Sequence, residues 1–171
     1  EALRAAGLRR VSFSLDSLDP ENFKKMTGRD GLEELLAAIR QSRVLGFDPI
    51  KVNAVVIRDL NDHEIEALGR YARDENLILR FIEFMPLDSG RLWKPDSVVS
   101  ETEIIDAISQ RHTLHLRPSQ NPHSTSRHYE FADGGPGRIG VIASVTRPFC
   151  GACNRLRVTA EGAVRPCLFS N

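Results

Sequence analysis

Segments typical of β-strands alternate with segments typical of α-helices through the first half of this 171-residue chain. Short runs rich in apolar and β-branched residues occupy 10–15, 50–57 and 77–84, and amphipathic stretches of helical period separate them. Strands joined through helices of roughly 10 to 15 residues form βαβ units, whose strands pair in parallel. The sequence therefore predicts an α/β fold in which right-handed crossovers place the helices on one side of a sheet or barrel.

Polar residues mark where the helices of this half are expected to begin. Asp19 precedes Pro20, which is the usual order of an N-cap and a first helical residue. Asp30 stands before a stretch with leucines at helical spacing, and Asn61 or Asp62 stands before the next amphipathic stretch. We therefore expect these residues to cap three helices.

The second half of the chain has a different character. Residues 85–99 form a long loop that contains proline, and Ser100 with Glu103 forms a capping box at the start of a further helix. The glycine-rich stretch 134–137 lies between two strand-like segments and predicts a hairpin. A second hairpin is expected around Gly162.

This change of character predicts two domains. The first is an α/β unit over residues 1–99, and the second is a small α+β unit over residues 100–171 that holds every cysteine. Within the second unit, residues 118–126 are rich in proline and serine and are expected to form an exposed loop.

Polar side chains recur at every second position of the expected strands. The polar positions that share a face in this way are Ser12, Ser14 and Asp16, and then Lys51 and Asn53; Glu83 shares its parity with Met85 at the end of the third strand. Parallel strands buried on both faces usually read as continuous apolar runs. A sheet curved around a wet or ligand-filled interior and an edge strand with a solvated face therefore both explain the pattern. In barrel-like α/β folds, ligands gather at the carboxyl ends of the strands, where Ser14 and Met85 lie.

The charge balance argues against two broad classes of partner. Lys and Arg together number 23, as do Asp and Glu, which gives a formal net charge of zero. A nucleic-acid-binding surface is usually marked by an excess of basic residues. The chain also has no run close to the roughly 18 apolar residues of a membrane span. We expect neither nucleic acid nor a membrane as a partner.

Three cysteines, Cys150, Cys153 and Cys167, lie within the last 22 residues. An odd number of cysteines so close together does not form a disulfide framework. It indicates thiols that are kept reduced, as in the cytoplasm, and that lie together to bind a metal. Cys150 and Cys153 form a C-x2-C pair, and 13 residues separate Cys153 from Cys167. The two-residue gap allows both thiolates of the pair to reach one metal centre.

Three thiolates are one ligand short of a closed zinc or iron–sulfur site, which leaves three explanations open. The first is a zinc ion bound by three cysteines and one histidine, and the second is a closed cluster completed by a residue outside this sequence. The third is an iron–sulfur cluster with one iron open to an exogenous ligand. The histidines that could complete a zinc site are His63, His112, His115, His123 and His128, none of which has a telling spacing.

Arg155 and Arg157 follow the C-x2-C pair and alternate along a strand-like segment, so we expect both side chains on one side. Two guanidinium groups beside thiolates are explained either by charge neutralisation or by a clamp for phosphate next to an open metal site. The sequence contains no Walker A motif and no glycine-rich dinucleotide loop. A metal beside phosphate-binding arginines favours a nucleotide or phosphorylated substrate.

Residues 148–171 read PFCGACNRLRVTAEGAVRPCLFSN, which closely resembles the C-terminal cluster motif of the GTP 3′,8-cyclase family. This family consists of radical S-adenosylmethionine enzymes that begin molybdenum cofactor biosynthesis. Further blocks of the family are similar, in the same order, to VSFSLDSLDPENF, KVNAVVIRDLN and LRFIEFMP, so the resemblance covers essentially the whole chain. It implies the C-terminal half of a partial (βα)6 radical-SAM barrel, followed by a small α+β iron–sulfur domain.

The resemblance also implies how this chain would hold cofactors. The three ligands of a C-terminal [4Fe–4S] cluster, whose open iron contacts the purine of GTP, are matched by Cys150, Cys153 and Cys167. Contacts to S-adenosylmethionine are matched by Ser14 and Met85. No catalytic side chain is implied within these residues.

Four positions match the family's contacts to GTP, namely Lys51, Arg155, Leu156 and Arg157. In the family, a first [4Fe–4S] cluster cleaves S-adenosylmethionine to a 5′-deoxyadenosyl radical, which takes the ribose 3′ hydrogen of GTP. The sugar carbon then attacks C8 of guanine to give (8S)-3′,8-cyclo-7,8-dihydroguanosine 5′-triphosphate. The resemblance thus implies a cytoplasmic lyase, a homodimer as the whole enzyme, whose product passes to cyclic pyranopterin monophosphate synthase.

The family's C-x3-C-x2-C motif for the first cluster does not occur in these residues. We therefore expect the sequence to be a piece of a longer enzyme and to cleave no S-adenosylmethionine on its own. Two alternatives to this function stay open. One is a non-catalytic zinc-ribbon-like binding module, and the other is a different radical S-adenosylmethionine enzyme with an auxiliary cluster.

Overall fold

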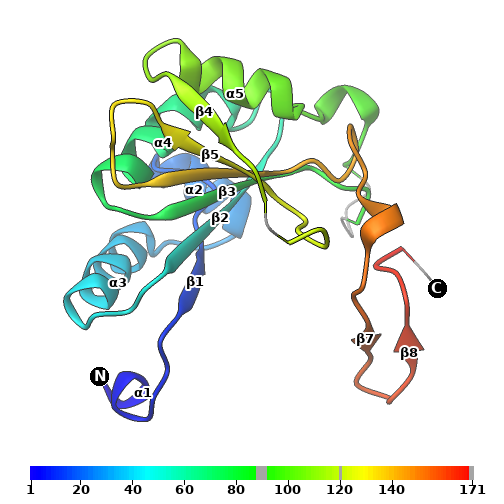
Figure 1. The fold of residues 1–171 in the computed structure, drawn as a ribbon, viewed down its shortest axis with the longest axis horizontal. Helices are drawn as coiled ribbons and strands as arrows, with labels where there is room; N and C mark the ends of the chain where they lie inside the picture. The colour runs from blue at the N-terminus through cyan, green and yellow to red at the C-terminus, as the bar shows by residue number, and fades with distance from the viewer. Residues whose placement is uncertain (88–91, 120, 170–171) are drawn as a thin grey trace.

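A six-stranded sheet forms the centre of the protein (Figure 1). The structure is a computed structural model that describes residues 1–87, 92–119 and 121–169. The strands lie in the order β1-β2-β3-β6-β5-β4. Their bounds are β1 Val11–Ser14, β2 Ile50–Val56, β3 Ile78–Glu83, β4 Leu114–Arg117, β5 Arg127–Phe131 and β6 Arg138–Ile142. The first four strands in this order pair in parallel, and β5 and β4 are added through antiparallel pairing. The predicted α/β fold with parallel pairing is confirmed.

Helices cover one face of this sheet (Figure 1). The helical segments are α1 Ala2–Ala5, α2 Pro20–Thr27, α3 Leu32–Val44, η1 Asp62–Glu64, α4 Ile65–Asp74, η2 Pro95–Ser97, α5 Glu101–Ser109 and η3 Cys150–Ala152. Apolar side chains such as Phe81 on β3 and Leu68 on α4 are fully buried in the layer between sheet and helices. No helix among the described residues has both the length and the apolar character needed to cross a bilayer.

The two predicted hairpins are both present. The stretch 134–137 joins β5 to β6 in an antiparallel pair. Around Gly162, whose φ of 83° is left-handed, the short strands β7 Arg157–Val158 and β8 Val164–Arg165 form a separate two-stranded sheet. This second hairpin extends away from the main sheet (Figure 1).

The pairing of β6 with β3 carries one sheet across residue 99. The division into domains over 1–99 and 100–171, and the closure of the sheet into a partial barrel, therefore stay predictions. The predicted loop over 85–99 contains the single turn η2, and its residues 88–91 lie outside the described residues.

Two of the predicted helix caps are confirmed. The Asp19 carboxylate accepts a hydrogen bond from the backbone N–H of Asn22 at 2.8 Å, at the start of α2. At the start of α5, the Ser100 hydroxyl accepts from the backbone N–H of Glu103, whose carboxylate accepts in turn from the backbone N–H of Ser100. These bonds satisfy donors that the first turn of a helix leaves unpaired.

Two other predicted caps are wrong. Gly31 precedes α3 and makes no side-chain cap, while the Asp30 carboxylate pairs with Lys24 Nζ at 3.0 Å. Asn61 is buried and its side chain makes no cap hydrogen bond, and Asp62 lies inside the single turn η1 that precedes α4. The Asn61 amide donates to the carbonyls of Asp16 and Val55, at 2.7 and 2.8 Å, and thereby links the ends of β1 and β2.

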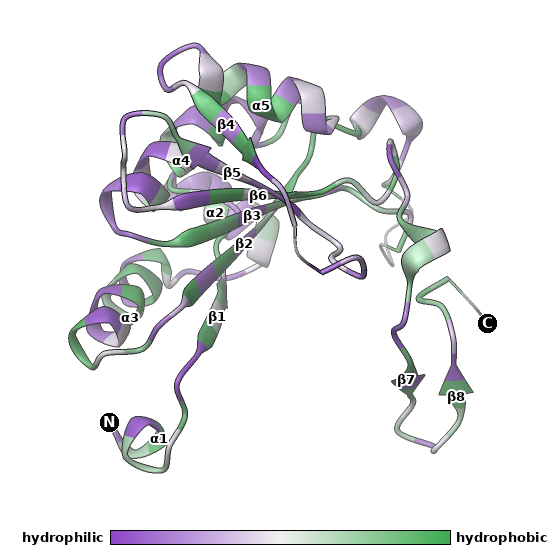
Figure 2. Ribbon diagram, viewed as in Figure 1, coloured by the Kyte–Doolittle hydropathy of each residue, from purple (hydrophilic) through white to green (hydrophobic). Residues whose placement is uncertain are grey.

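The other face of the sheet carries no helix (Figure 2), and a row of mostly polar residues crosses it. Ladder partners that share this face follow one another across the sheet in the order Ser14, Asn53, Arg80, Gly140, His128 and Arg117. The prediction that Ser14, Lys51 and Asn53 belong to a polar face is confirmed. For Glu83 the prediction is wrong. Glu83 follows Arg80 by three residues on β3, so its side chain points to the opposite face, where it is fully buried on the helix side.

Candidate functional site

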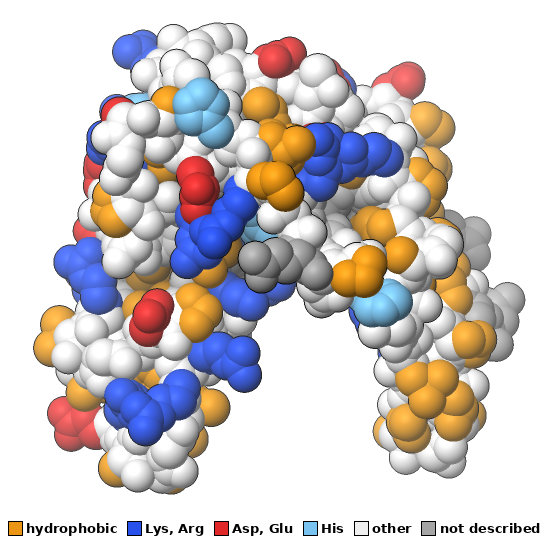
Figure 3. Space-filling model, in the orientation of Figure 1, with side chains coloured by type: hydrophobic (Ala, Val, Ile, Leu, Met, Phe, Trp, Pro, Cys, Tyr) orange, Lys and Arg blue, Asp and Glu red, His pale blue; other side chains and the backbone are white. Residues whose placement is uncertain are grey.

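Basic side chains gather on the helix-free face near the start of the parallel strands. Lys51 lies on β2 and Arg138 on β6, while His128 and Arg117 come from β5 and β4. Together they line a cavity of about 530 Å³. Figure 3 shows Lys and Arg side chains along the N-terminal side of the hollow that separates the body of the protein from the β7–β8 hairpin. The sheet therefore brings together cations that lie far apart in the sequence.

Arg80 extends this cluster toward the middle of the sheet. It is half-buried on β3, and its Nε donates to Asn53 Oδ1 at 2.8 Å. A fixed guanidinium on a rigid strand is well suited to bind phosphate or carboxylate, because its planar fork is already oriented.

The pKa values on this face have a common physical cause. Burial, followed by the charges of Arg80 and Arg10, lowers the pKa of Lys51. Burial, and then several cations led by Arg138 and including Lys51, lowers the pKa of His128. Cations that disfavour one another's charged forms create a positive potential, which an anion would relieve.

Gly140 makes the crowding of this face possible. A Cβ atom at this position would lie 2.6 Å from Ser126 Oγ, 3.2 Å from Arg80 Cγ and 3.4 Å from His128 Nδ1. A glycine here therefore leaves room for the Arg80 and His128 side chains to approach each other across β6.

Ser14 and Met85 lie where the sequence predicts them. Ser14 ends β1 and is exposed, and the half-buried Met85 follows β3 by two residues. Both lie at the carboxyl end of the parallel strands. Nearby, the Asp16 carboxylate accepts from the backbone N–H of Val55 at 2.8 Å, while burial raises the Asp16 pKa. Contacts of Ser14 and Met85 to a cofactor stay a prediction.

Cys150 begins the single turn η3, and Cys153 follows its last residue. The Cys153 sulfur accepts a hydrogen bond from Arg155 Nη2 at 3.4 Å. The backbone N–H of Arg155, and then its guanidinium, lower the pKa of the Cys153 thiol. These donors favour the thiolate, which is the form that binds metals.

Arg155 does not lie on the strand that carries Arg157. β7 begins at Arg157, and the Arg155 guanidinium turns back over the Phe149 ring, 4.9 Å from its centroid. The prediction that the two arginines alternate along one strand is therefore wrong. Leu156 between them is 66% exposed, so it contributes nothing to the core.

Cys167 lies on the chain that follows β8, and its sulfur accepts from the backbone N–H of Phe169 at 3.4 Å. The three thiols are exposed and are the donor type that iron–sulfur clusters and zinc prefer, so their chemistry fits a thiolate-bound metal. Within 1–87, 92–119 and 121–169, however, no three His, Cys, Asp or Glu side chains are grouped closely enough to hold one metal ion. The cluster and its three ligands stay a prediction.

His123 is the candidate zinc ligand that contacts the cysteine turn, because its Nδ1 lies 2.7 Å from the carbonyl oxygen of Ala152. His128 instead belongs to the cationic face, and His112 packs edge-on against Phe131. The structure thus gives no three-cysteine, one-histidine grouping among the residues it describes.

Arg80 and Arg138 are candidate binding residues that the strand patterns did not single out. Arg80 alternates with Leu79 and Phe81, and that alternation is a usable signal for the polar face. Arg138 carries no comparable signal, because its place beside β3 depends on a pairing between segments distant in sequence.

Two family models match this sequence. The model for Molybdenum Cofactor Synthesis C matches residues 77–171, and the model for the Radical SAM superfamily matches residues 1–72. A GTP 3′,8-cyclase of Streptomyces coelicolor is 46% identical over 169 residues, which cover 99% of this chain and 50% of that relative. One of Rhodopirellula baltica is 44% identical over 171 residues, with 98% and 47% covered. One of Xanthomonas campestris is 40% identical over 171 residues, with 99% and 50% covered. The chain spans about half the length of the curated relatives it matches.

Proposed function

Since the chain belongs to the Molybdenum Cofactor Synthesis C family, we propose that it is part of a GTP 3′,8-cyclase, a radical S-adenosylmethionine lyase of molybdenum cofactor biosynthesis. The reaction converts GTP to (8S)-3′,8-cyclo-7,8-dihydroguanosine 5′-triphosphate. Relatives named for this activity align over nearly the whole chain, which supports the proposal. In the structure, the observation that carries it is the set of cations around Lys51 on the helix-free face.

The triphosphate of GTP is the anion that we assign to this face. Lys51 and Arg80 offer charged donors on two adjacent strands, and Arg138 and His128 extend the positive surface beyond them. A triphosphate carries enough negative charge to engage several of these groups at once. This use of the face supports the further proposal that the sheet is the C-terminal half of a partial barrel over residues 1–99, with the nucleotide in its interior.

The other end of the nucleotide is assigned to the cysteine region within 100–171. We propose that Cys150, Cys153 and Cys167 hold a [4Fe–4S] cluster whose open iron takes the purine, and that Arg155, Leu156 and Arg157 contact GTP. The lowered pKa of Cys153 supports thiolate ligation. Ser14 and Met85 would contact S-adenosylmethionine, which, together with a second [4Fe–4S] cluster, supplies the radical when bound.

The proposed cluster and activity also lead to proposals for the compartment, the downstream partner and the oligomeric state of the enzyme. Thiols that serve a cluster must stay reduced, which needs a reducing compartment, so we place the enzyme in the cytoplasm. Its product would pass to cyclic pyranopterin monophosphate synthase, and the whole enzyme would be a homodimer. All three cysteines of these 171 residues belong to one proposed cluster, so this polypeptide alone is expected to be inactive.

The proposal is tested by replacing both arginines beside the cysteines. In the protein reconstituted anaerobically with iron and sulfide, the double change Arg155→Ala and Arg157→Ala is expected to weaken GTP binding about 100-fold, since two charge-assisted contacts are lost. Anaerobic calorimetry measures the affinity. The matched control removes two exposed arginines from helices on the covered side, Arg40→Ala with Arg70→Ala, and should leave the affinity unchanged. A colourless protein with one zinc, or equal affinity in both double variants, would contradict the proposal.

Arg80→Ala separates phosphate contacts from guanine contacts. If Arg80 binds the triphosphate, its loss should weaken GTP about 30-fold and leave guanosine within about twofold, because guanosine has no phosphate. Arg80→Lys keeps the charge but not the fork and should fall between. Arg70→Ala serves as the control, and calorimetry with both ligands gives the comparison. An equal loss for GTP and guanosine would show that Arg80 acts on the fold or on the base instead.

A further inference from the structure

Glu83, the last residue of β3, is 0% exposed, and each of its carboxylate oxygens accepts two hydrogen bonds. Oε2 accepts from the backbone N–H groups of Val145 and Thr146, both at 2.8 Å. Oε1 accepts from the Thr146 hydroxyl at 2.5 Å and from the backbone N–H of Glu101 at 3.2 Å. A buried carboxylate with four donors makes bonds that are strengthened by its charge and by the exclusion of water.

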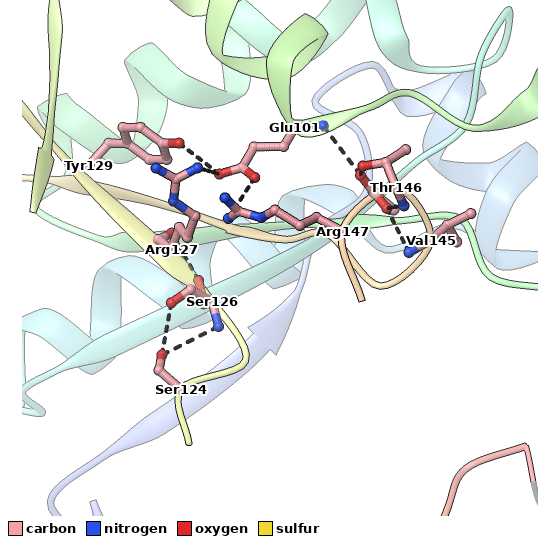
Figure 4. A network of polar contacts seen from close by, with 9 residues as sticks. Glu101, Ser124, Ser126, Arg127, Tyr129, Val145, Thr146 and Arg147 are labelled. Carbon is pink, nitrogen blue, oxygen red and sulfur yellow. Dashed lines mark hydrogen bonds and ion pairs between the residues drawn. The ribbon is translucent and has the colours of Figure 1, made fainter. Parts of the chain in front are cut away.

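A second buried carboxylate, that of Glu101 at the first position of α5, binds Arg147, the residue that follows Thr146 (Figure 4). Glu101 Oε2 lies 2.9 Å from Arg147 Nη2, and Oε1 accepts from the Tyr129 hydroxyl at 2.7 Å. Burial and this hydrogen bond raise the pKa of Tyr129 to about 12. Three consecutive residues, 145–147, are thus tied to β3 and α5 by two carboxylates.

These residues belong to the linking segment, residues 143–149, which joins β6 to η3. Thr146 precedes Cys150 by four residues, so their Cα atoms lie at most about 14 Å apart. On the other side, Glu83 precedes Met85 by two residues. The Glu83 carboxylate therefore connects the carboxyl end of β3 with the approach to the cysteine pair.

We propose that Glu83 is a positioning residue that fixes the linking segment, and with it Cys150 and Cys153, against the carboxyl end of β3. The inference rests on the proposed function, in which the cysteine region binds GTP and the carboxyl ends of the strands hold the S-adenosylmethionine that acts on it. Groups that must meet the same substrate need a set separation, and rigid support of that separation has large effects on binding and rate.

The charge of Glu83 is essential to this role, because every partner is a donor. Glutamine has the same shape but only one acceptor oxygen, and its NH2 group would face two of the four donors. Those donors would be left buried without an acceptor, which is the costly outcome for a polar group in a protein interior. The linking segment should then loosen while β3 stays in place.

Glu64 offers a matched control elsewhere in the fold. It is also buried, and both of its oxygens accept two hydrogen bonds, from Ser17, Leu18, Asp19 and Asn22. Glu64→Gln therefore removes the same kind of acceptor without touching the linking segment. A general loss of stability would appear in both variants, and a positioning effect on residues 145–153 would appear only in Glu83→Gln.

The test compares these variants in the protein reconstituted anaerobically with iron and sulfide. Backbone amide hydrogen exchange over 145–153, followed by mass spectrometry, is expected to be at least about tenfold faster in Glu83→Gln and unchanged in Glu64→Gln. GTP affinity, read from the change in iron–sulfur absorbance, is expected to fall about tenfold only in Glu83→Gln. Thr146→Ser keeps the hydroxyl donor and should match the wild type, whereas Thr146→Val should show part of the effect.

The outcomes separate the inference from the function on which it rests. Unchanged exchange over 145–153 in folded Glu83→Gln overturns the inference, as does an equal acceleration in Glu64→Gln. If Glu83→Gln does not fold, the difference between Thr146→Val and Thr146→Ser decides in its place. Faster exchange in Glu83→Gln, with no GTP binding by the wild type, supports the positioning role and contradicts the proposed function.

Discussion

Replacing Cys153 with alanine is expected to remove about four irons per chain from the anaerobically reconstituted protein, because two thiolates do not hold a cubane cluster that is built on three. The iron–sulfur absorbance that responds to GTP should disappear with those irons. Iron and sulfide analysis, together with absorbance titration by GTP, measures both effects. The lowered pKa of Cys153 favours its thiolate, which is the form that binds metal.

The neighbouring exposed residue provides the control for this change. Asn154→Ala alters the same turn without removing a sulfur and should keep the full iron content. Cys167→Ala should behave like Cys153→Ala if the hairpin that precedes Cys167 brings this thiol back to the pair. Full iron content in Cys167→Ala would restrict the ligand set to the C-x2-C pair and would refute the assignment of three ligands.

Local sequence signals were sufficient for much of the fold. The alternation of strand and helix, the hairpin at 134–137 and the capping box of Ser100 and Glu103 all depend on residues close together in the chain. Asn61 shows where such signals fail, because its amide satisfies the carbonyls of Asp16 and Val55 instead of opening a helix. A tertiary partner outweighed a local preference whose energy is only about 1 kcal/mol.

The candidate site was less predictable for the same reason. Lys51 and the cysteines could be named from motifs, but the cationic face needs β6 beside β3, a pairing between residues about 60 positions apart in sequence. The sequence pattern assigns Glu83 to the polar face because Glu83 and Met85 lie two residues apart, and residues two apart on a strand point to the same side. Its true surroundings are donors at 145–146, which no pattern within β3 could reveal.

The close packing against α4 of the residue just before β6 can itself be tested at Gly137. A Cβ atom there would lie 2.3 Å from the carbonyl oxygen of Ala72, and 2.6 Å from the Cα of Arg73. These are backbone atoms of α4 and cannot rotate away. β6 cannot retreat either, because the backbone N–H of Arg138 donates to the carbonyl of Leu77 at 2.9 Å at the start of the β3–β6 ladder.

Gly137→Ala is therefore expected to lower the free energy of unfolding by about 3 kcal/mol, at the upper end of the usual overpacking cost. Gly135→Ala, two residues earlier, is the matched control, because its Cβ would meet the Arg73 and Asp133 side chains, which can move. It should cost only about 1 kcal/mol. Urea unfolding of both variants gives the difference, and equal losses would contradict the close approach of β6 to α4. Since β6 also carries Arg138 and Gly140, any Gly137→Ala protein that folds should bind GTP more weakly than Gly135→Ala, which links the packing of this strand to the cationic face.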